Sequence, residues 1–257
     1  MSQKVWVVVP HHSRFDLLEK SLASVADHSV IVVDDSVSGL KHSLPEVVVL
    51  RTSGETGFAK SCNVGLGRAE SEGAEWVLLL NDDAILEEGA LEALLEAAKA
   101  HQHADAFGPV LVGPTGIESA GLCFSPRTAR VVQRTDVPDA PREVMALSGA
   151  CLLVRSFWRF SEEFPHAMED IDLGLRIREV GKKSLLVPGA RCWHLGGGTR
   201  SRKDPRATRD ALRGHLRLVG PRRDKRFLVV IYAVAQVLRE GPRLRRLGAV
   251  WQGWRMG

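Results

Sequence analysis

Residues 76–83 read W-V-L-L-L-N-D-D, five apolar residues followed directly by one asparagine and two aspartates. An unbroken apolar run of this length is typical of a strand whose two faces are both covered by helices, as in a parallel sheet. Because the polar residues follow without a spacer, Asn81–Asp83 are expected at the carboxyl end of that strand. Open α/β sheets bind their ligands at this edge.

The segments on either side extend the same arrangement. Strands are predicted at Val5–Val9, Val30–Val33 and Val47–Leu50, and helices over residues 14–27, 59–70 and 87–100. This alternation predicts an α/β fold with a mostly parallel sheet. From 106 to 155, short apolar runs between turn signals indicate antiparallel strands, followed by a helix over 169–180 and a short strand over 184–187.

Length and composition exclude several classes of protein. A chain of 257 residues with 44% hydrophobic content can bury a full core, so a disordered protein is not expected. The four cysteines are scattered, which indicates reduced, buried thiols rather than a disulfide framework or a cysteine zinc site. No signal peptide is recognisable before the first strand, and we expect a cytoplasmic protein.

Charge divides the chain unevenly. Residues 200–257 contain 16 Lys and Arg against 4 Asp and Glu, a net charge of +12, while residues 1–199 carry −8. We therefore expect a domain over 1–200, with halves at about 1–105 and 106–200, and a basic helical extension over 201–257.

The extension contains a 12-residue apolar run, Phe227–Leu238, which is too short for the roughly 20 residues of a membrane span. It is expected either to pack on the domain or, with Trp251, Trp254 and the arginines, to face an anionic membrane surface. No nucleic-acid-binding fold is recognisable.

Three acidic clusters could carry chemistry. Asp34 and Asp35 follow a predicted strand, where a carboxylate can bind a ribose hydroxyl or a base N–H; the alternative is an Asx turn. Asp82 and Asp83 are adjacent carboxylates that need compensation by a cation or by protons. Mg²⁺ or Mn²⁺ bridging to a diphosphate would supply it, and a cap for the following helix would account only for Asp83.

The third cluster, Glu169, Asp170 and Asp172, begins a predicted helix. One of these carboxylates could act as a general base on a hydroxyl, or the cluster could simply complement the helix dipole. His194 precedes three glycines, and Arg200, Arg202 and Lys203 follow, which indicates a phosphate-binding loop; the alternative is a structural histidine. The other eight histidines, His11 and His12 included, have no comparable context.

Three well-known motifs are absent from the sequence. It contains no G-x-x-x-x-G-K-[ST], no G-x-G-x-x-G after the first strand and no G-x-S-x-G elbow. Their absence disfavours a P-loop NTPase, a dinucleotide dehydrogenase and an α/β-hydrolase.

Seven segments, taken in order, resemble glycosyltransferase family 2, especially its rhamnosyltransferase-like bacterial members. They are V-V-V-P, V-V-D-D-S, T-G-F-A-K-S-C-N-V-G, L-L-L-N-D-D-A, L-S-G-A-C-L-L-V-R, M-E-D-I-D-L-G-L-R and W-H-L-G-G-G-T, and they span about residues 4–200. Each segment is weakly specific alone, but seven in this order are specific.

The resemblance implies a GT-A fold, inversion at the anomeric carbon, and a nucleoside-diphosphate sugar donor with Mg²⁺ or Mn²⁺. The acceptor would be a glycan or lipid-linked hydroxyl of bacterial cell-surface polysaccharide or glycolipid synthesis. It implies donor contacts at Pro10, Asp34, Asp35, Gly57, Asn63 and Asp82. The metal would be held by Asp83 and His194, although N-D-D departs from a spaced D-x-D, so either aspartate could contact it. Asp170 would be the general base, with Glu169 beside it.

Two rival functions remain open from the sequence. A sugar-phosphate nucleotidyltransferase also binds a nucleotide and a metal on an α/β sheet, but residues 10–16, P-H-H-S-R-F-D, contain no glycine. A non-catalytic module that binds a nucleotide sugar would not need the third acidic cluster.

Overall fold

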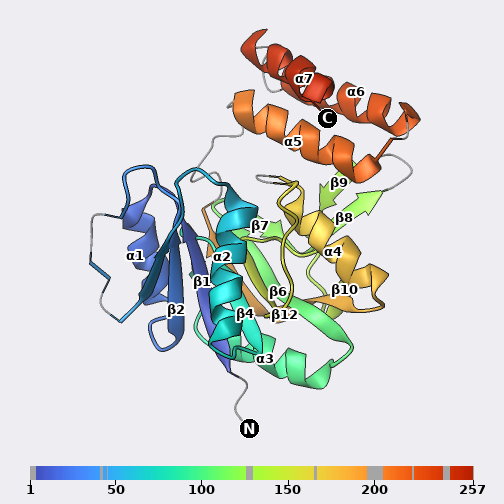
Figure 1. Cartoon of the computed structure of the whole chain (residues 1–257). Coiled ribbons are helices and arrows are strands. Elements are labelled where there is room, and N and C mark those ends of the chain that lie inside the picture. The colour runs from blue at the N-terminus through green and yellow to red at the C-terminus, as the bar shows by residue number, and fades with distance from the viewer. Residues whose placement is uncertain are drawn as a thin grey trace.

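The first four strands form the parallel half of a central sheet, as a computed structural model of the chain shows (Figure 1). The structure describes residues 4–40, 43–44, 46–125, 130–164, 167–195, 205–221, 223–239 and 244–256. In the order β3-β2-β1-β4 these strands are parallel to their neighbours. Their bounds are β1 (Val5–His11), β2 (Ser29–Asp34), β3 (Val48–Arg51) and β4 (Trp76–Leu80).

Beyond β4 the sheet is mixed and continues β11-β6-β12-β10. The antiparallel pairing expected between residues 106 and 155 is confirmed for β11 with β4 and β6, although β6 also pairs in parallel with β12. The bounds are β5 (Ala84–Leu86), β6 (Ala104–Gly113), β7 (Gly116–Ser119), β10 (Arg142–Val144), β11 (Cys151–Arg155) and β12 (Lys183–His194). A separate ribbon contains β8 (Leu122–Ser125) and β9 (Arg130–Gln133).

Helices cover both faces of the sheet. One apolar cluster joins the sheet to α1 and α3, and a second joins the opposite face to α2 and α4. Their bounds are α1 (Phe15–Ala23), α2 (Phe58–Ser71), α3 (Ala90–Ala100) and α4 (Glu169–Glu179). Trp76, Leu78 and Leu80 belong to the first cluster, and Val77 and Leu79 to the second. Both faces of β4 are therefore buried, as its continuous apolar sequence predicts.

Three C-terminal helices pack together at one end of the sheet, drawn orange to red in Figure 1. They are α5 (Pro205–Val219), α6 (Arg223–Arg239) and α7 (Leu244–Met256). A third apolar cluster includes Leu216 of α5, Val229 and Val237 of α6 and Ile171 of α4. The packed-helix alternative for the apolar run is thus confirmed for part of that run. None of the described helices combines the length and apolar character that a bilayer span requires.

Several element boundaries differ from the sequence prediction. The strand expected at residues 184–187 extends to His194, because an irregular register between Val187 and Arg191 lets the chain continue past Pro188. The helix expected from Glu87 begins at Ala90, because Ala84–Leu86 pairs with β12. The first helix ends at Ala23 rather than near 27. The four cysteines are free and three are buried, as expected.

Gly65 is the point of closest approach between α2 and the sheet. A Cβ atom there would lie 2.3 Å from Val8 Cγ1 and 3.1 Å from Val33 Cγ2. Both valines are fully buried strand residues, so neither can move aside cheaply. Any side chain at position 65 would push the helix away from β1 and β2.

We therefore expect Gly65→Ala to destabilise the protein by about 1–3 kcal/mol, the usual cost of overpacking a core. Gly67→Ala on the same helix is the matched control, since its Cβ would meet only the Arg159 side chain, at 3.9 Å. There the gain in helix propensity should leave stability unchanged or slightly higher. Urea unfolding of both variants measures the difference, and equal effects at the two positions would contradict the close-packing argument.

Candidate active site

A cavity of about 1100 Å³ lies between the strand ends and the C-terminal helices. Eight of the ten residues that the sequence analysis assigned to a site line it: Pro10, Asp35, Gly57, Asp82, Asp83, Glu169, Asp170 and His194. Members of the three acidic clusters, up to 135 positions apart in the chain, thus meet in one space. The glycines and basic residues that follow His194, including Arg200, Arg202 and Lys203, lie outside the described residues.

Asp35 organises the loop between β3 and α2. Its Oδ1 accepts hydrogen bonds from the Thr52 hydroxyl and from the Thr56 amide at 3.0 Å, and its Oδ2 accepts one from the Gly57 amide at 3.1 Å. Burial by itself would raise the pKa of Asp35, but these hydrogen bonds outweigh it and lower the pKa. Asp35 is therefore an ionised group that shapes the cavity wall next to Pro10.

Asp34 and Asn63 do not line the cavity. Asp34 Oδ1 accepts from the Ser36 amide at 3.0 Å, and Oδ2 accepts from the Leu40 amide at 2.7 Å, which is the Asx-type turn that the sequence left open. Asn63 forms a reciprocal pair with the Phe160 backbone, donating at 2.9 Å and accepting at 2.8 Å. In this structure both side chains stabilise loops around the site.

His11 is a cavity residue that the sequence analysis passed over. It is buried, and its Nδ1 lies 2.8 Å from Asp82 Oδ2, which also accepts from the His12 amide at 3.4 Å. Position explains the pair, because β1 and β4 are parallel neighbours that end side by side. The available signal was that His11, like the aspartates, directly follows an apolar strand sequence.

Asp83 and His194 face each other across the end of the sheet. In the antiparallel pairing of β5 with β12, His194 is opposite Ala84, the residue after Asp83. His194 Nε2 consequently lies 3.3 Å from Asp83 Oδ1, and its Nδ1 lies 2.9 Å from Glu118 Oε2 on β7. Because α3 starts only at Ala90, with Gly89 at its cap position, Asp83 does not cap that helix.

Glu118 fixes the orientation of His194. No local sequence motif predicts this role for Glu118. Burial would lower the pKa of His194, but the hydrogen bonds and charges of Asp83 and Glu118 raise it to about 10. A histidine held through one ring nitrogen by a carboxylate is a common arrangement for directing the other nitrogen at a metal. Here that second nitrogen points at Asp83 and the cavity.

The residues present fit a divalent cation at this position. The Asp83 carboxylate suits Mg²⁺ or Mn²⁺, and the oriented His194 nitrogen suits Mn²⁺ once a bound cation displaces its proton. Within the described ranges, no group of three or more His, Cys, Asp or Glu side chains could enclose a metal ion on its own. The chain would supply only part of the ligand set, as is usual where diphosphate oxygens complete it.

Glu169 and Asp170 begin α4 at the cavity, after Met168 in the left-handed conformation, with φ of 71°. Burial first, and the neighbouring Asp170 charge second, raise the pKa of Glu169 to about 8. Burial also raises the pKa of Asp170 to about 6, against backbone hydrogen bonds that lower it. Glu169 Oε2 and Asn81 Oδ1 are buried without a hydrogen-bond partner among the described residues. A bound substrate could supply such partners.

The third carboxylate of that cluster has a different environment. Asp172 does not line the cavity, and its Oδ2 accepts a hydrogen bond from Arg176 Nε at 2.8 Å. It therefore supports α4 through an ion pair four residues along the helix. Of this cluster, only the first two residues of α4, Glu169 and Asp170, line the cavity, although helical spacing alone would put Asp172 on the same face as Glu169.

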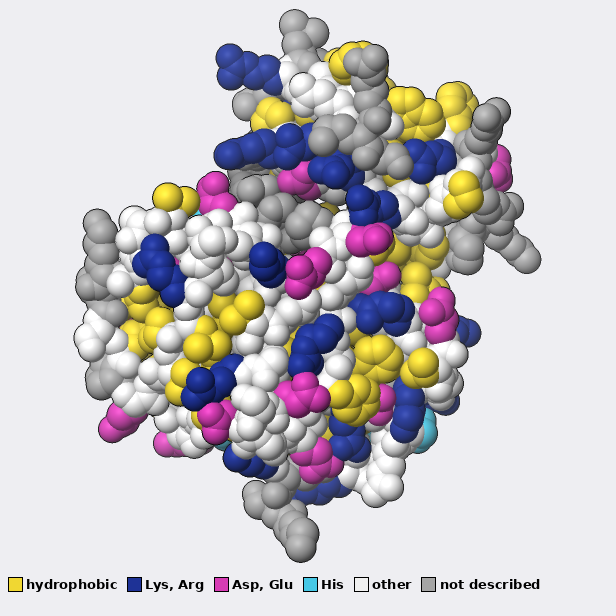
Figure 2. Space-filling model, viewed as in Figure 1, with side chains coloured by type: hydrophobic (Ala, Val, Ile, Leu, Met, Phe, Trp, Pro, Cys, Tyr) yellow, Lys and Arg dark blue, Asp and Glu magenta, His cyan; other side chains and the backbone are white. Residues whose placement is uncertain are grey.

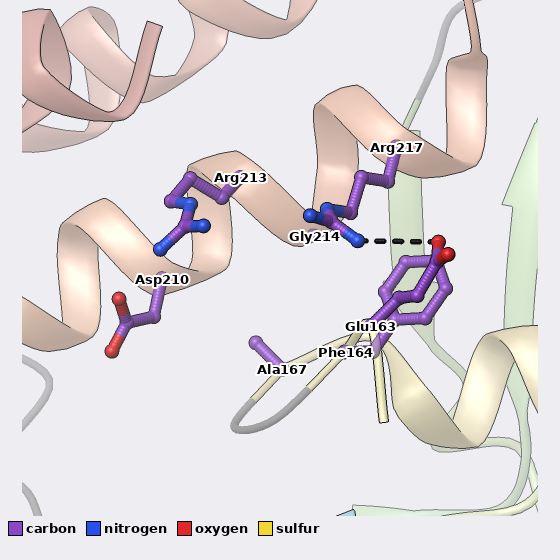
Figure 3. A pocket seen from close by; sticks show the side chains of 7 residues that line it. All are labelled: Glu163, Phe164, Ala167, Asp210, Arg213, Gly214 and Arg217. Atoms are coloured by element: carbon purple, nitrogen blue, oxygen red, sulfur yellow. Dashed lines mark hydrogen bonds and ion pairs between the residues drawn. The ribbon is translucent and has the colours of Figure 1, made fainter. Parts of the chain in front are cut away.

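The C-terminal helices hold the loop that leads into α4 (Figure 3). A Cβ atom at Gly214 of α5 would lie 2.6 Å from the Ala167 carbonyl oxygen, so helix and loop are in direct contact. Nearby, Arg217 Nη1 donates to Glu163 Oε2 at 3.2 Å, as Figure 3 marks. The helices therefore help to position Glu169 and Asp170, which follow this loop.

Comparisons with known proteins identify the class. In fold the chain is similar to GalNAc-T7, solved with UDP, GalNAc and Mn²⁺ (TM-score 0.68, 14% identity, 98% of this chain and 54% of that one). It is also similar to residues 1–349 of S. aureus TarS in complex with UDP-GlcNAc (TM-score 0.59, 16% identity, 96% and 79%). The chain spans about half the length of the GalNAc-T7 chain. Its fold is the GT-A fold of glycosyltransferases.

Sequence similarity identifies the family. The model of Glycosyl transferase family 2 matches residues 6–155. Over 223 residues the chain is 32% identical to N-acetylglucosaminyl-diphospho-decaprenol L-rhamnosyltransferase of Mycobacterium tuberculosis (strain ATCC 25618 / H37Rv), with 72% of each protein covered. The chain is a glycosyltransferase and belongs to glycosyltransferase family 2, which confirms the resemblance seen in its sequence.

The raised pKa of Glu169 predicts a pH-dependent effect on stability. Between its ordinary pKa of 4.5 and its folded pKa of about 8, the folded protein retains a proton that the unfolded chain releases. The contribution of this group to stability therefore falls as pH rises through that window. Glu169→Gln removes the ionisation, so its stability relative to the parent protein should increase from pH 5 to pH 8.

Thermal unfolding at pH 5, 7 and 9 measures this trend. Glu179→Gln is the matched control, because Glu179 lies at the other end of α4 and is exposed, and its effect should not follow the same trend. A Glu169→Gln effect that is constant across the three pH values would contradict the buried-carboxylate interpretation.

Proposed function

We propose that this chain is an inverting glycosyltransferase that transfers a sugar from a nucleoside diphosphate to a hydroxyl of a lipid-linked acceptor. One observation carries the proposal: the Asp83–His194 pair and the Glu169–Asp170 pair face the same cavity. Single displacement has two requirements. A group must remove the proton of the acceptor hydroxyl, and positive charge must lie beside the leaving diphosphate. Such a displacement needs no enzymic nucleophile.

Asp170 is the proposed general base. With a pKa near 6 it is ionised at neutral pH, while Glu169, with a pKa near 8, stays largely protonated and can donate a hydrogen bond. Asp170 accepts the proton of the acceptor hydroxyl as that oxygen bonds to the anomeric carbon. The bond from this carbon to the diphosphate oxygen breaks in the same step, which inverts the configuration.

Asp83 and His194 would hold Mg²⁺ or Mn²⁺, with Asp82 beside them. The cation would neutralise negative charge on the diphosphate. The proposed wall for the nucleoside consists of Pro10 near the end of β1, Asp35 after β2 and Gly57 at the cap of α2, which all line the cavity. Asp35 is already ionised and could accept a hydrogen bond from a ribose hydroxyl or a base.

The acceptor proposal draws on the relative. The Mycobacterium tuberculosis enzyme is named for transfer of L-rhamnose to N-acetylglucosaminyl-diphospho-decaprenol, a lipid-linked sugar. We propose that this chain uses an acceptor of the same kind, in bacterial cell-surface polysaccharide or glycolipid synthesis at the cytoplasmic face of the membrane. The two rival functions, a nucleotidyltransferase and a non-catalytic module, would not require a general base at the position of Asp170.

Incubation with Mn²⁺, a lipid-diphosphate-linked N-acetylglucosamine and a panel of UDP-, dTDP- and GDP-sugars, with an L-rhamnosyl donor among them, tests the proposal. We expect one donor to release its nucleotide and extend the acceptor, with inversion seen by NMR of the product. Nucleotide release without a new glycoside, for every donor, would contradict it.

Asp170→Asn should lower turnover by about 10²–10⁴-fold, the usual contribution of a general base, with donor affinity nearly unchanged. The loss falls on turnover because the base acts on the acceptor rather than on the diphosphate. Asp172→Asn is the control and should retain most activity, since Asp172 is paired with Arg176. Near-normal turnover of Asp170→Asn would move the base to Glu169.

Asp83→Asn should weaken donor binding strongly, because it removes a negative ligand of the proposed cation. Calorimetric titration of the donor nucleotide, with Mn²⁺ and then with EDTA, measures the effect. The parent protein should lose affinity in EDTA, whereas the variant should bind weakly in both. Equal affinity of the parent protein in the two buffers would remove the metal from the proposal.

The C-terminal helices are also proposed to lie on an anionic membrane surface. Phe227, Ile231 and Leu238 are 64%, 45% and 53% exposed along one side of α6, and Trp251 and Trp254 are 58% and 41% exposed on α7. Figure 2 shows basic side chains among the apolar ones in this part of the molecule. Each basic residue close to an anionic leaflet contributes about 1 kcal/mol of attraction.

Sedimentation with vesicles that contain anionic lipid tests this contact. We expect the protein to pellet at low salt and to be released at high salt, because exposed charges are screened. The double variant Phe227→Ala, Trp251→Ala should pellet less, whereas Val49→Ala, at an exposed residue of β3, should behave as the parent does. Equal pelleting with neutral vesicles, or none at low salt, would contradict the proposal.

A further inference from the structure

The active-site cavity has two walls of different chemistry. Strand ends and loops form one wall, with Pro10, Asp35 and Gly57. Residues from β9 and the three C-terminal helices form part of the other, and those helices lie outside the 6–155 segment that matches the family. Asp83 and Asp170 also line the cavity. If the first wall holds the donor, the second remains for the molecule whose hydroxyl meets Asp170.

The second wall combines apolar side chains with polar ones, which include Arg130, Asp210 and His215. Apolar side chains of β9, α5 and α6 line it: Val131, Ala211 and Ala233 are partly exposed. Behind them Leu212, Val229 and Val237 are buried in the third apolar cluster. Tyr232 adds an aromatic ring, with the Arg130 guanidinium 5.5 Å from its centroid. Tyr232 is also 37% exposed, so this wall reaches the surface of α6. A sugar offers little apolar area to such a wall, whereas a hydrocarbon chain would bury it.

A buried arginine is part of the same wall. Arg246 of α7 is only 3% exposed, yet it lines the cavity. Its Nε donates a hydrogen bond to Thr208 Oγ1 of α5 at 3.1 Å, which orients the guanidinium plane. The wall also carries Asp210, whose Oδ1 accepts from Arg209 Nε at 3.0 Å. A fixed guanidinium next to apolar surface suits a phosphate group attached to a hydrocarbon chain.

We propose that Arg246 binds the diphosphate of a lipid-linked acceptor, and that the apolar side chains of α5 and α6 bind the adjoining part of its hydrocarbon chain. The inference rests on the proposed function for the kind of acceptor. It assigns acceptor specificity to the C-terminal helices, which the family match does not include. The wall at Tyr232 then gives the lipid a route from the cavity to the exposed side of α6.

Farnesyl diphosphate is a suitable probe because it joins a diphosphate to a short isoprenoid chain. Calorimetry with the full-length protein in EDTA separates this site from metal-dependent nucleotide binding. We expect Arg246→Gln to weaken farnesyl diphosphate binding by about tenfold or more, the usual effect of losing a charged hydrogen bond. The dissociation constant of farnesol, which lacks the diphosphate, should differ by less than about twofold between the variant and the parent protein.

Two further variants sharpen the comparison. Arg246→Lys keeps the charge and should retain part of the affinity, and Arg245→Gln, at an exposed neighbour on α7, should bind as the parent protein does. If Arg246→Gln does not fold, hydrogen exchange of the parent protein replaces it. Farnesyl diphosphate should then protect backbone amides of α5 and α7, and protection confined to the strand ends would overturn the inference.

Other outcomes separate this inference from the proposed function. Absence of farnesyl diphosphate binding, or an equal loss of farnesol and farnesyl diphosphate affinity in Arg246→Gln, overturns the role of Arg246 even if the enzyme glycosylates an acceptor. Farnesyl diphosphate binding that requires Arg246 supports the site even if no donor in the panel reacts, because the measurement involves no transfer. In that case only the proposed function would fail.

Discussion

Both faces of β4 are sealed by apolar packing, and this constraint shapes the rest of the molecule. Trp76, Leu78 and Leu80 pack toward α1 and α3, while Val77 and Leu79 pack toward α2 and α4. A carboxylate within such a strand would lose its hydration without compensation, so the strand's polar residues have to follow its last apolar residue. Asp82 and Asp83 lie there, close to the ends of β1 and β2. The position of the site is thus a consequence of how the core is packed.

The carboxylates that gather at this edge are stabilised in three different ways. Asp35 is ionised and held by hydrogen bonds from the 52–57 loop, and Asp83 faces a histidine whose pKa is raised to about 10. Glu169 is shielded from water, and the cost of charging it appears as a raised pKa. A glycosyltransferase can use this division, because it requires positive charge beside the leaving group and an ionisable carboxylate near the acceptor.

The C-terminal helices form part of the candidate site as well as extending the domain. Gly214 brings α5 against the Ala167 carbonyl, and so supports the loop before Glu169 and Asp170. Residues of α5, α6 and α7 also close one side of the cavity. If Asp170 is the base as proposed, a surface that contacts both the residue before α4 and the cavity is well placed to select the acceptor. Acceptor choice could then change through these helices while the donor half of the fold stays the same.

The sequence by itself determined the α/β class, the apolar strands, the three acidic clusters and the family, because each depends on local periodicity or on residues that are contiguous in the chain. Only the tertiary structure decided which carboxylates meet. It directs Asp35 into the cavity while Asp34 closes a turn, joins His11 to Asp82, and orients His194 through Glu118. It also extends β12 past Pro188 and places Arg246 in the cavity wall. The two side-chain pairings connect residues 71 and 76 positions apart, and the other features depend on strand register and helix packing, so local sequence patterns carry no signal for them.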